Sequence, residues 1–327
     1  MAGASSGGLQ TKRELGKATR DAFGRALEAI GENHPEIVVV DGDVSNSTRT
    51  EWFGKKHPDR FFNVGIAESN LVGVAAGLAA SGKTSVIASF AAFITCNAYD
   101  QLRMSVAYPG LNVKVVGSHA GISIGEDGAS QMGVEDVSLA CSLPGFVVMV
   151  PADEESTKAA TKAMLEHQGP VYLRVGRPDV PKIYTDGSAS FQIGKANKLR
   201  DGSDLTIVAN GIMVSLALDA AEALESQGIK ARVLDMHTVK PIDRDALLAA
   251  ARETGALVVA EEHLAHGGLG SSVAYTVAEL HPVPIRYVNL LDQFAESGAP
   301  DELLEKFGLT AGKIGEAAKA AVAAKKG

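Results

Sequence analysis

One acidic side chain opens a helix that is otherwise built from small and apolar residues. The segment GIAESN places Glu68 ahead of a run of Gly, Ala, Val and Leu that ends at Ala80. Apolar surroundings destabilise the charged form of a carboxyl group, which can then share a proton with a basic ring nitrogen. The alternative is an ordinary helix-terminal residue that the helix dipole favours.

Two aromatic residues follow about twenty positions later. Phe90 and Phe93, in the segment SFAAF, have i, i+3 spacing and come directly after a predicted strand at 85–89. Ligands bind at the carboxyl ends of strands in open α/β sheets. Flat apolar rings are suited to stack on a heterocycle, although core packing is the alternative for such a pair.

Two arginines and the acid of a GEDG loop have ordinary structural roles when each is considered alone. Arg20 and Arg177 would each be a surface or salt-bridge residue. Asp127, in the GEDG loop, would form an Asx turn.

Alternating helices and strands must position these residues. Helical patterns at 15–30, 70–80 and 92–106 separate short apolar strands at 37–40, 61–64, 85–89, 112–117, 146–150 and 171–175. Strands separated by helices at this spacing predict βαβ crossovers and a mainly parallel sheet covered on both faces.

A second series of strands, at 205–209, 231–236, 257–261 and 285–288, follows a stretch without periodicity. We therefore predict an α/β fold of two domains, at 11–190 and 191–327, behind a flexible tail at 1–10. A length of 327 residues suits two domains, because single cores stop growing efficiently beyond about 250 residues.

Composition excludes several classes of partner. The net charge of -8 offers no basic stripe, so no nucleic acid is expected. No run reaches the roughly 18 apolar residues that span a bilayer, so neither a membrane anchor nor an export signal is expected. The only cysteines, Cys96 and Cys141, form no CxxC pair, and a reducing cytoplasm is the expected location.

In this order and spacing, GIAESN, SFAAF and GSHAGISIGEDGASQ resemble the pyrimidine-binding domain of transketolases. The resemblance runs from about Thr11 to the C-terminal end. It implies a thiamine-diphosphate enzyme in which Glu68 hydrogen-bonds N1' of the aminopyrimidine and so promotes loss of the thiazolium C2 proton. The residues that it places around the cofactor are Phe90, Phe93, Val44, Asp43 and Ile66.

The same resemblance implies that Arg20, Ser47, His119 and Arg177 hold a sugar phosphate, with His119 also a catalytic proton or hydroxyl partner. Asp127 would bind a sugar hydroxyl. Gln131 stands where the family usually has His, so this substrate-site position differs and the sugar preference stays open. The second domain resembles the transketolase C-terminal domain, in which residues 261–263 are expected at an interface or strand end rather than in catalysis.

The family's diphosphate and metal motif is missing. Its near match, DGDVSN, lacks the second Gly and has Asn46 too close, so we interpret this segment as a loop. The resemblance therefore implies a separate N-terminal subunit that holds the diphosphate and Mg²⁺ or Ca²⁺. It also implies a homodimer core within an α2β2 assembly, because the family's cofactor lies between protomers.

Three functions remain open. The first is a transketolase subunit that moves a two-carbon ketol unit between phosphorylated sugars, and the GEDG loop with the two arginines favours it. The second keeps the cofactor in a 2-oxoacid dehydrogenase β-type subunit or a deoxyxylulose-phosphate-synthase-like fragment. The third is a non-catalytic assembly protein.

Overall fold

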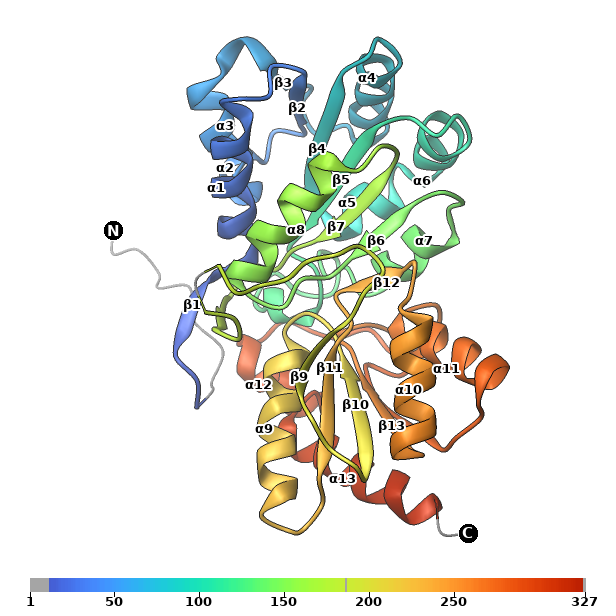
Figure 1. Cartoon of the computed structure of the whole chain (residues 1–327). Helices are drawn as coiled ribbons and strands as arrows, with labels where there is room; N and C mark the ends of the chain where they lie inside the picture. The colour runs from blue at the N-terminus through green and yellow to red at the C-terminus, as the bar shows by residue number, and fades with distance from the viewer. Residues whose placement is uncertain (1–11, 186, 326–327) are drawn as a thin grey trace.

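A computed structural model describes residues 12–185 and 187–325 of the chain. Two α/β units lie end to end, the N-terminal unit above the C-terminal unit in Figure 1. The predicted α/β fold of two domains is confirmed. The predicted tail at 1–10 lies outside the described residues.

The first unit is built around a seven-stranded sheet of order β12-β6-β7-β5-β4-β2-β3. Neighbouring strands are parallel except for β12, so the predicted mainly parallel sheet is confirmed. Every residue of β2 and β4 is buried, as expected of strands covered on both faces. The strands are β2 (Ile37–Asp41), β3 (Phe61–Asn63), β4 (Thr84–Phe90), β5 (Val113–Ser118), β6 (Val147–Met149), β7 (Val171–Arg174) and β12 (Thr238–Lys240).

Helices cover both faces of this sheet. Val39 packs with helices α1 (Thr19–Gly31), α3 (Thr50–Lys56) and α8 (Glu154–Glu166). Val40, which points to the other face, packs with α4 (Glu68–Ala80), α5 (Ala91–Cys96) and α7 (Asp136–Ser142). The alternation along one strand thus divides the core into two apolar layers.

The continuous helix expected at 92–106 is wrong. It is divided into α5, α6 (Tyr99–Gln101) and the π-helical η2 (Leu102–Ala107). The Thr95 hydroxyl donates to the Ala91 carbonyl at 2.7 Å, one residue before α5 ends at Cys96.

The helix expected from residue 15 is also wrong in its first turn. Residues 15–18 form strand β1 (Leu15–Ala18), antiparallel to β8 (Asp179–Pro181). The Ala18 amide donates to the Asp179 carboxylate at 3.0 Å, and the Lys182 amide donates to the Glu14 carbonyl at 2.9 Å. These partners lie more than 160 positions away, so no local pattern could predict them.

The second unit holds a five-stranded sheet of order β14-β13-β10-β11-β9, parallel except for β9. Its strands are β9 (Asn197–Arg200), β10 (Leu205–Ala209), β11 (Ala231–Asp235), β13 (Leu257–Ala260) and β14 (Ile285–Val288). Its helices are α9 (Met213–Glu225), α10 (Arg244–Thr254), α11 (Leu269–Leu280), α12 (Pro300–Lys306) and α13 (Ala311–Ala324).

The two units share buried contacts. Strand β12 lies within the second series of elements yet pairs with β6 of the first sheet. Phe90 and Ile122 of the first unit belong to one apolar cluster with Ile212 of the second. The proposed division between 190 and 191 remains a prediction. No helix in residues 12–185 or 187–325 combines the length and apolar character needed to cross a membrane.

Candidate active site

The residues singled out from the sequence follow the carboxyl ends of neighbouring strands. In sheet order, β3 is followed by Glu68, β2 by Val44 and β5 by His119, while β4 ends with Phe90 and is followed by Phe93. Arg177 follows the next strand, β7. Because parallel strands end at the same edge of a sheet, side chains from distant segments gather there.

Glu68 is the first residue of α4, with a relative exposure of 8%. Within the described chain its carboxylate has no hydrogen bond and no ion pair. The adjacent Ser69 hydroxyl donates to the Asn97 carbonyl at 2.9 Å, which ties this turn to the end of α5. A buried carboxylate without a protein partner is suited to bind a donor that comes from outside the chain.

Three rings form a stack beside the sheet edge. The Phe90 and Phe93 ring centroids lie 5.5 Å apart with an interplanar angle of 3°. His119 lies against Phe90, with ring centroids 3.9 Å apart at 11°. Phe93, at the outer end of this stack, is partly exposed.

His119 is held as a neutral ring. Arg20 Nη1 lies 2.9 Å from His119 Nε2, and a guanidinium can only donate, so Nε2 accepts. Nδ1 therefore carries the proton and donates to Ser118 Oγ at 2.8 Å. Burial, and then the charges of Arg20, Arg177 and Arg49, lower the pKa of His119 to about 3.

Arg20 joins the His119 ring to the loop after β2. Its Nη1 also donates to the Ser47 carbonyl at 3.2 Å. Burial, followed by the charge of Arg49, lowers the pKa of Arg20 to about 10, so the group remains a cation near neutral pH. The structure brings Arg20, Ser47 and His119 together, although Ser47 contributes its carbonyl and not its hydroxyl.

Arg177 and Asp127 form a second, more open pair. Arg177 Nη1 lies 3.3 Å from Asp127 Oδ2, and the same nitrogen donates to the Ile124 carbonyl at 3.2 Å. Both side chains are about one third exposed. This carboxylate and this guanidinium remain available to a ligand, because water already competes for the hydrogen bonds of both groups.

The remaining predicted residues differ in their surroundings. Val44 packs at the edge of the apolar cluster shared with the second unit, and the Asp43 carboxylate accepts from Asn63 at 2.8 Å. Ile66 is 77% exposed, and the Gln131 side chain makes no hydrogen bond among the described residues. Their roles toward a cofactor or sugar remain predictions.

The second unit fixes the GEDG loop. The Glu262 carboxylate accepts from the Ser123 amide at 2.6 Å. A Cβ on Gly121 would lie 2.1 Å from Glu262, and a Cβ on Gly128 would lie 2.4 Å from Ser297 Oγ. Both glycines also have positive φ values, so this close approach requires residues without a side chain.

A buried ion pair lies directly behind this loop. Arg174 binds the Asp136 carboxylate at 2.8 and 3.1 Å and also donates to the Gly133 and Glu262 carbonyls. The Tyr172 hydroxyl donates to the same carboxylate at 2.6 Å. The pair thus connects both units, which explains why two charges are retained in the interior.

Residues 261–263 follow strand β13, as the sequence indicated. The Glu261 carboxylate accepts from the amides of Leu269 and Gly270 at the start of α11, both at 2.7 Å. His263 Nε2 accepts from the Ser138 amide of the first unit at 3.3 Å. All three side chains are buried in structural contacts of the chain.

The sequence patterns did not indicate that Asp21, Arg49 and Ser118 contact the candidate site residues. They also did not indicate the contact between Glu262 and the Ser123 loop. Asp21 and Ser118 are immediate neighbours of Arg20 and His119, and Arg49 lies two positions after Ser47. For these three residues, the position next to or near a candidate residue was the only signal in the sequence. Glu262 gave no such signal, because its partner lies 139 positions away.

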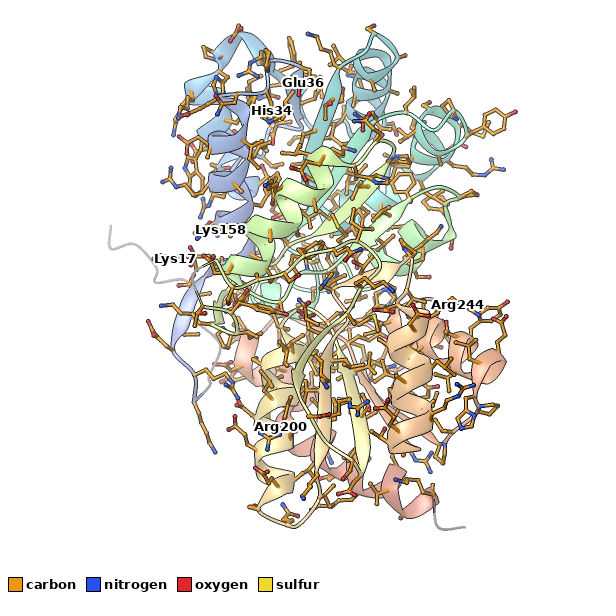
Figure 2. The ribbon with its side chains drawn as sticks, viewed as in Figure 1. Lys17, His34, Glu36, Lys158, Arg200 and Arg244 are labelled. Carbon is orange, nitrogen blue, oxygen red and sulfur yellow. The ribbon has the colours of Figure 1, made fainter. Side chains whose placement is uncertain are left out.

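A cavity of about 640 Å³ lies at the opposite, amino ends of the strands. It is lined by His34, Glu36, Thr84 and Asn112 among others. Figure 2 shows His34 and Glu36 at the far end of the first unit, away from the second unit. This cavity is therefore separate from the residues that the sequence singled out.

The residues of the site fit the pyrimidine half of thiamine diphosphate. Glu68 would hold N1' of the aminopyrimidine, and Phe93 offers an aromatic face for the ring. No three His, Cys, Asp or Glu side chains gather as a metal site in the described ranges.

Comparison with protein families matches two models over most of the chain. Residues 16–182 match "Transketolase, pyrimidine binding domain", and residues 194–314 match "Transketolase, C-terminal domain". A solved structure described as "Split gene transketolase, inactive beta4 tetramer" is 48% identical with a TM-score of 0.89, covering 95% of this chain and 100% of that one.

Curated relatives agree with these matches. The "6-deoxy-6-sulfo-D-fructose transketolase subunit SqwH" of Clostridium sp. (strain MSTE9) is 46% identical over 91% of this chain and 92% of its own length. Human transketolase is 39% identical over 92% of this chain, which spans 48% of that protein. The chain belongs to the transketolase family, of which it spans the pyrimidine-binding and C-terminal domains.

Proposed function

We propose that this chain is the pyrimidine-binding subunit of a split, thiamine-diphosphate-dependent transketolase. It would transfer a two-carbon ketol unit between phosphorylated sugars after assembly with a separate diphosphate-binding subunit. The observation that carries the proposal is Glu68, a residue with 8% exposure whose carboxylate has no hydrogen bond or ion pair within the described chain.

When bound, thiamine diphosphate supplies the nucleophilic thiazolium carbon that takes up the ketol unit. Glu68 would share a proton with the aminopyrimidine nitrogen, and Phe93 would exclude water from one face of that ring. His119, as a neutral ring, would accept a hydrogen bond from a sugar hydroxyl at Nε2 in exchange for the one that Arg20 donates, while Arg20 and Arg177 would bind the sugar phosphate.

A partner subunit is part of the proposal. Human transketolase has about twice the length of this chain, and the related split-gene protein is described as an inactive β4 tetramer. We therefore propose an α2β2 assembly in which the partner holds the diphosphate and Mg²⁺ or Ca²⁺.

The test combines the purified chain with its N-terminal subunit, thiamine diphosphate and Mg²⁺. We expect transfer of glycolaldehyde from xylulose 5-phosphate to ribose 5-phosphate, and no transfer by the chain alone. Glu68→Ala should lower kcat by a factor of about 100 or more, because it removes the group that shares the proton. Glu68→Gln, which keeps the shape, should lose activity as well.

Three outcomes contradict the proposal. Full activity of the Glu68→Ala assembly would assign the chain to a structural role. Activity with pyruvate instead of xylulose 5-phosphate would favour the 2-oxoacid reaction. Turnover by the chain alone would remove the need for a partner.

A further inference from the structure

Two arginines share one carboxylate oxygen beside the candidate phosphate end of the site. Arg49 Nε donates to Asp21 Oδ1 at 2.6 Å. Arg20 Nε lies 3.8 Å from the same oxygen, is buried, and makes no hydrogen bond among the described residues. Arg49 therefore hydrogen-bonds the carboxylate, whereas Arg20 forms only a longer ion pair with it.

Arg49 is fixed in place from several sides. It lies between α2 (Ser45–Thr48) and α3, with a φ of 69° that favours glycine. Its guanidinium also donates to the Asn46 carbonyl and lies 5.6 Å from the centre of the Trp52 ring. A Cβ on Gly24 would lie 2.5 Å from the Arg49 Cβ, so α1 packs directly against this residue.

This arrangement determines what Arg20 can bind. The Arg20 side chain is only 11% exposed, and its Nη1 is directed to His119 and Ser47. Without Arg49, the nearest cation to Asp21 would be Arg20. The Arg20 Nε, which makes no hydrogen bond among the described residues, would then donate to the Asp21 carboxylate. An internal carboxylate on Arg20 would then compete with an anionic substrate for the same guanidinium.

We propose that Arg49 is a positioning residue for substrate recognition: it holds Asp21 away from Arg20 and so keeps Arg20 available for the phosphate of a sugar phosphate. The proposal rests on the proposed function and adds a residue that sets the preference for dianionic over neutral sugars. Arg49 acts through Asp21 and does not itself contact the substrate.

The test measures binding of ribose 5-phosphate and of ribose to the assembled enzyme by calorimetry, without a ketol donor. Arg49→Gly suits the left-handed backbone and removes the side chain. We expect its Kd for ribose 5-phosphate to rise about tenfold, the scale of one lost charge contact, while its Kd for ribose stays unchanged. The double variant Asp21→Asn/Arg49→Gly should bind ribose 5-phosphate about as well as the wild type, because the competing carboxylate is gone.

Arg25→Ala is the matched control, since Arg25 lies 4.0 Å from the centre of the same Trp52 ring but pairs with Glu28. It should leave both affinities unchanged. An unchanged Kd in Arg49→Gly, an equal loss for ribose and ribose 5-phosphate, or no recovery in the double variant would each overturn the inference.

The same enzyme preparation separates this inference from the proposed reaction. The first outcome is a wild-type assembly that transfers no ketol unit from xylulose 5-phosphate, while the variants show the expected changes in Kd for ribose 5-phosphate. This outcome would refute the reaction and leave the role of Arg49. Normal transfer together with an unchanged Arg49→Gly would refute the role of Arg49 alone. Wild-type binding that does not distinguish ribose 5-phosphate from ribose would contradict both.

Discussion

The Glu262 carboxylate accepts a hydrogen bond from the Ser123 amide at 2.6 Å, and this contact joins the second unit to the loop that carries Asp127. Glu262 is buried, so its carboxylate cannot be replaced by water without rearrangement. The second unit therefore takes part in fixing the loop that carries Asp127.

Glu262→Ala should release this loop. The unpaired Ser123 amide should lower the free energy of unfolding by about 1–3 kcal/mol, and KM for phosphorylated sugars should rise. Urea unfolding and steady-state kinetics measure the two effects. Glu262→Gln keeps an acceptor oxygen and should retain most of both properties, while an unchanged KM in Glu262→Ala would show that the loop does not depend on this contact.

Replacing Arg177 by Ala should weaken binding of phosphorylated sugars by about tenfold and spare neutral sugars, because only the former present a dianion. Its pair with Asp127 is partly exposed and contributes about 0–1 kcal/mol, so thermal stability should change little. Asp127→Asn serves as the control, since a hydroxyl contact affects both classes of sugar. An equal loss for both classes in Arg177→Ala would contradict the phosphate role.

His119 should remain neutral throughout the working pH range. Its pKa is lowered to about 3 from 6.5, with burial as the first cause. The unfolded chain therefore binds this proton at higher pH than the native chain, and the stability contributed here is lost as pH falls from about 6.5 to about 3. The NMR signal of the His119 ring, assigned by its absence in His119→Asn, should show no titration between pH 5 and 8. A midpoint near 6.5 would contradict the buried, neutral ring.

Asp136→Asn should destabilise the chain more than any surface substitution. The Arg174 guanidinium would lose its counter-charge in the interior, at a cost of about 3–5 kcal/mol. Chemical denaturation measures this loss. Lys162→Met, which removes an exposed partner of Glu166, is the control and should change stability by less than about 1 kcal/mol. Comparable effects of the two variants would argue against a buried, dry pair.

Local sequence patterns were sufficient to predict the positions of most strands. The β-branched run at 37–40 and the apolar runs at 205–209 and 285–288 became strands β2, β10 and β14 with nearly the same bounds. Such runs carry their own preference for extended structure and burial. The helix predicted at 92–106 is divided into α5, α6 and the π-helical η2, although its apolar periodicity continues.

The sequence by itself determined the α/β class, the strand ends, and the identity of side chains such as Glu68, Phe90 and His119 that follow them. The class and the strands follow from periodicity and spacing, which neighbouring residues encode, whereas these side chains were singled out through the resemblance of their motifs to the transketolase pyrimidine-binding domain. Only the tertiary structure decided that Arg49 rather than Arg20 holds Asp21, that Glu262 binds the Ser123 loop, and that β12 joins the first sheet. Those contacts join residues that are separated along the chain and meet only in the folded structure, so no local pattern predicts them.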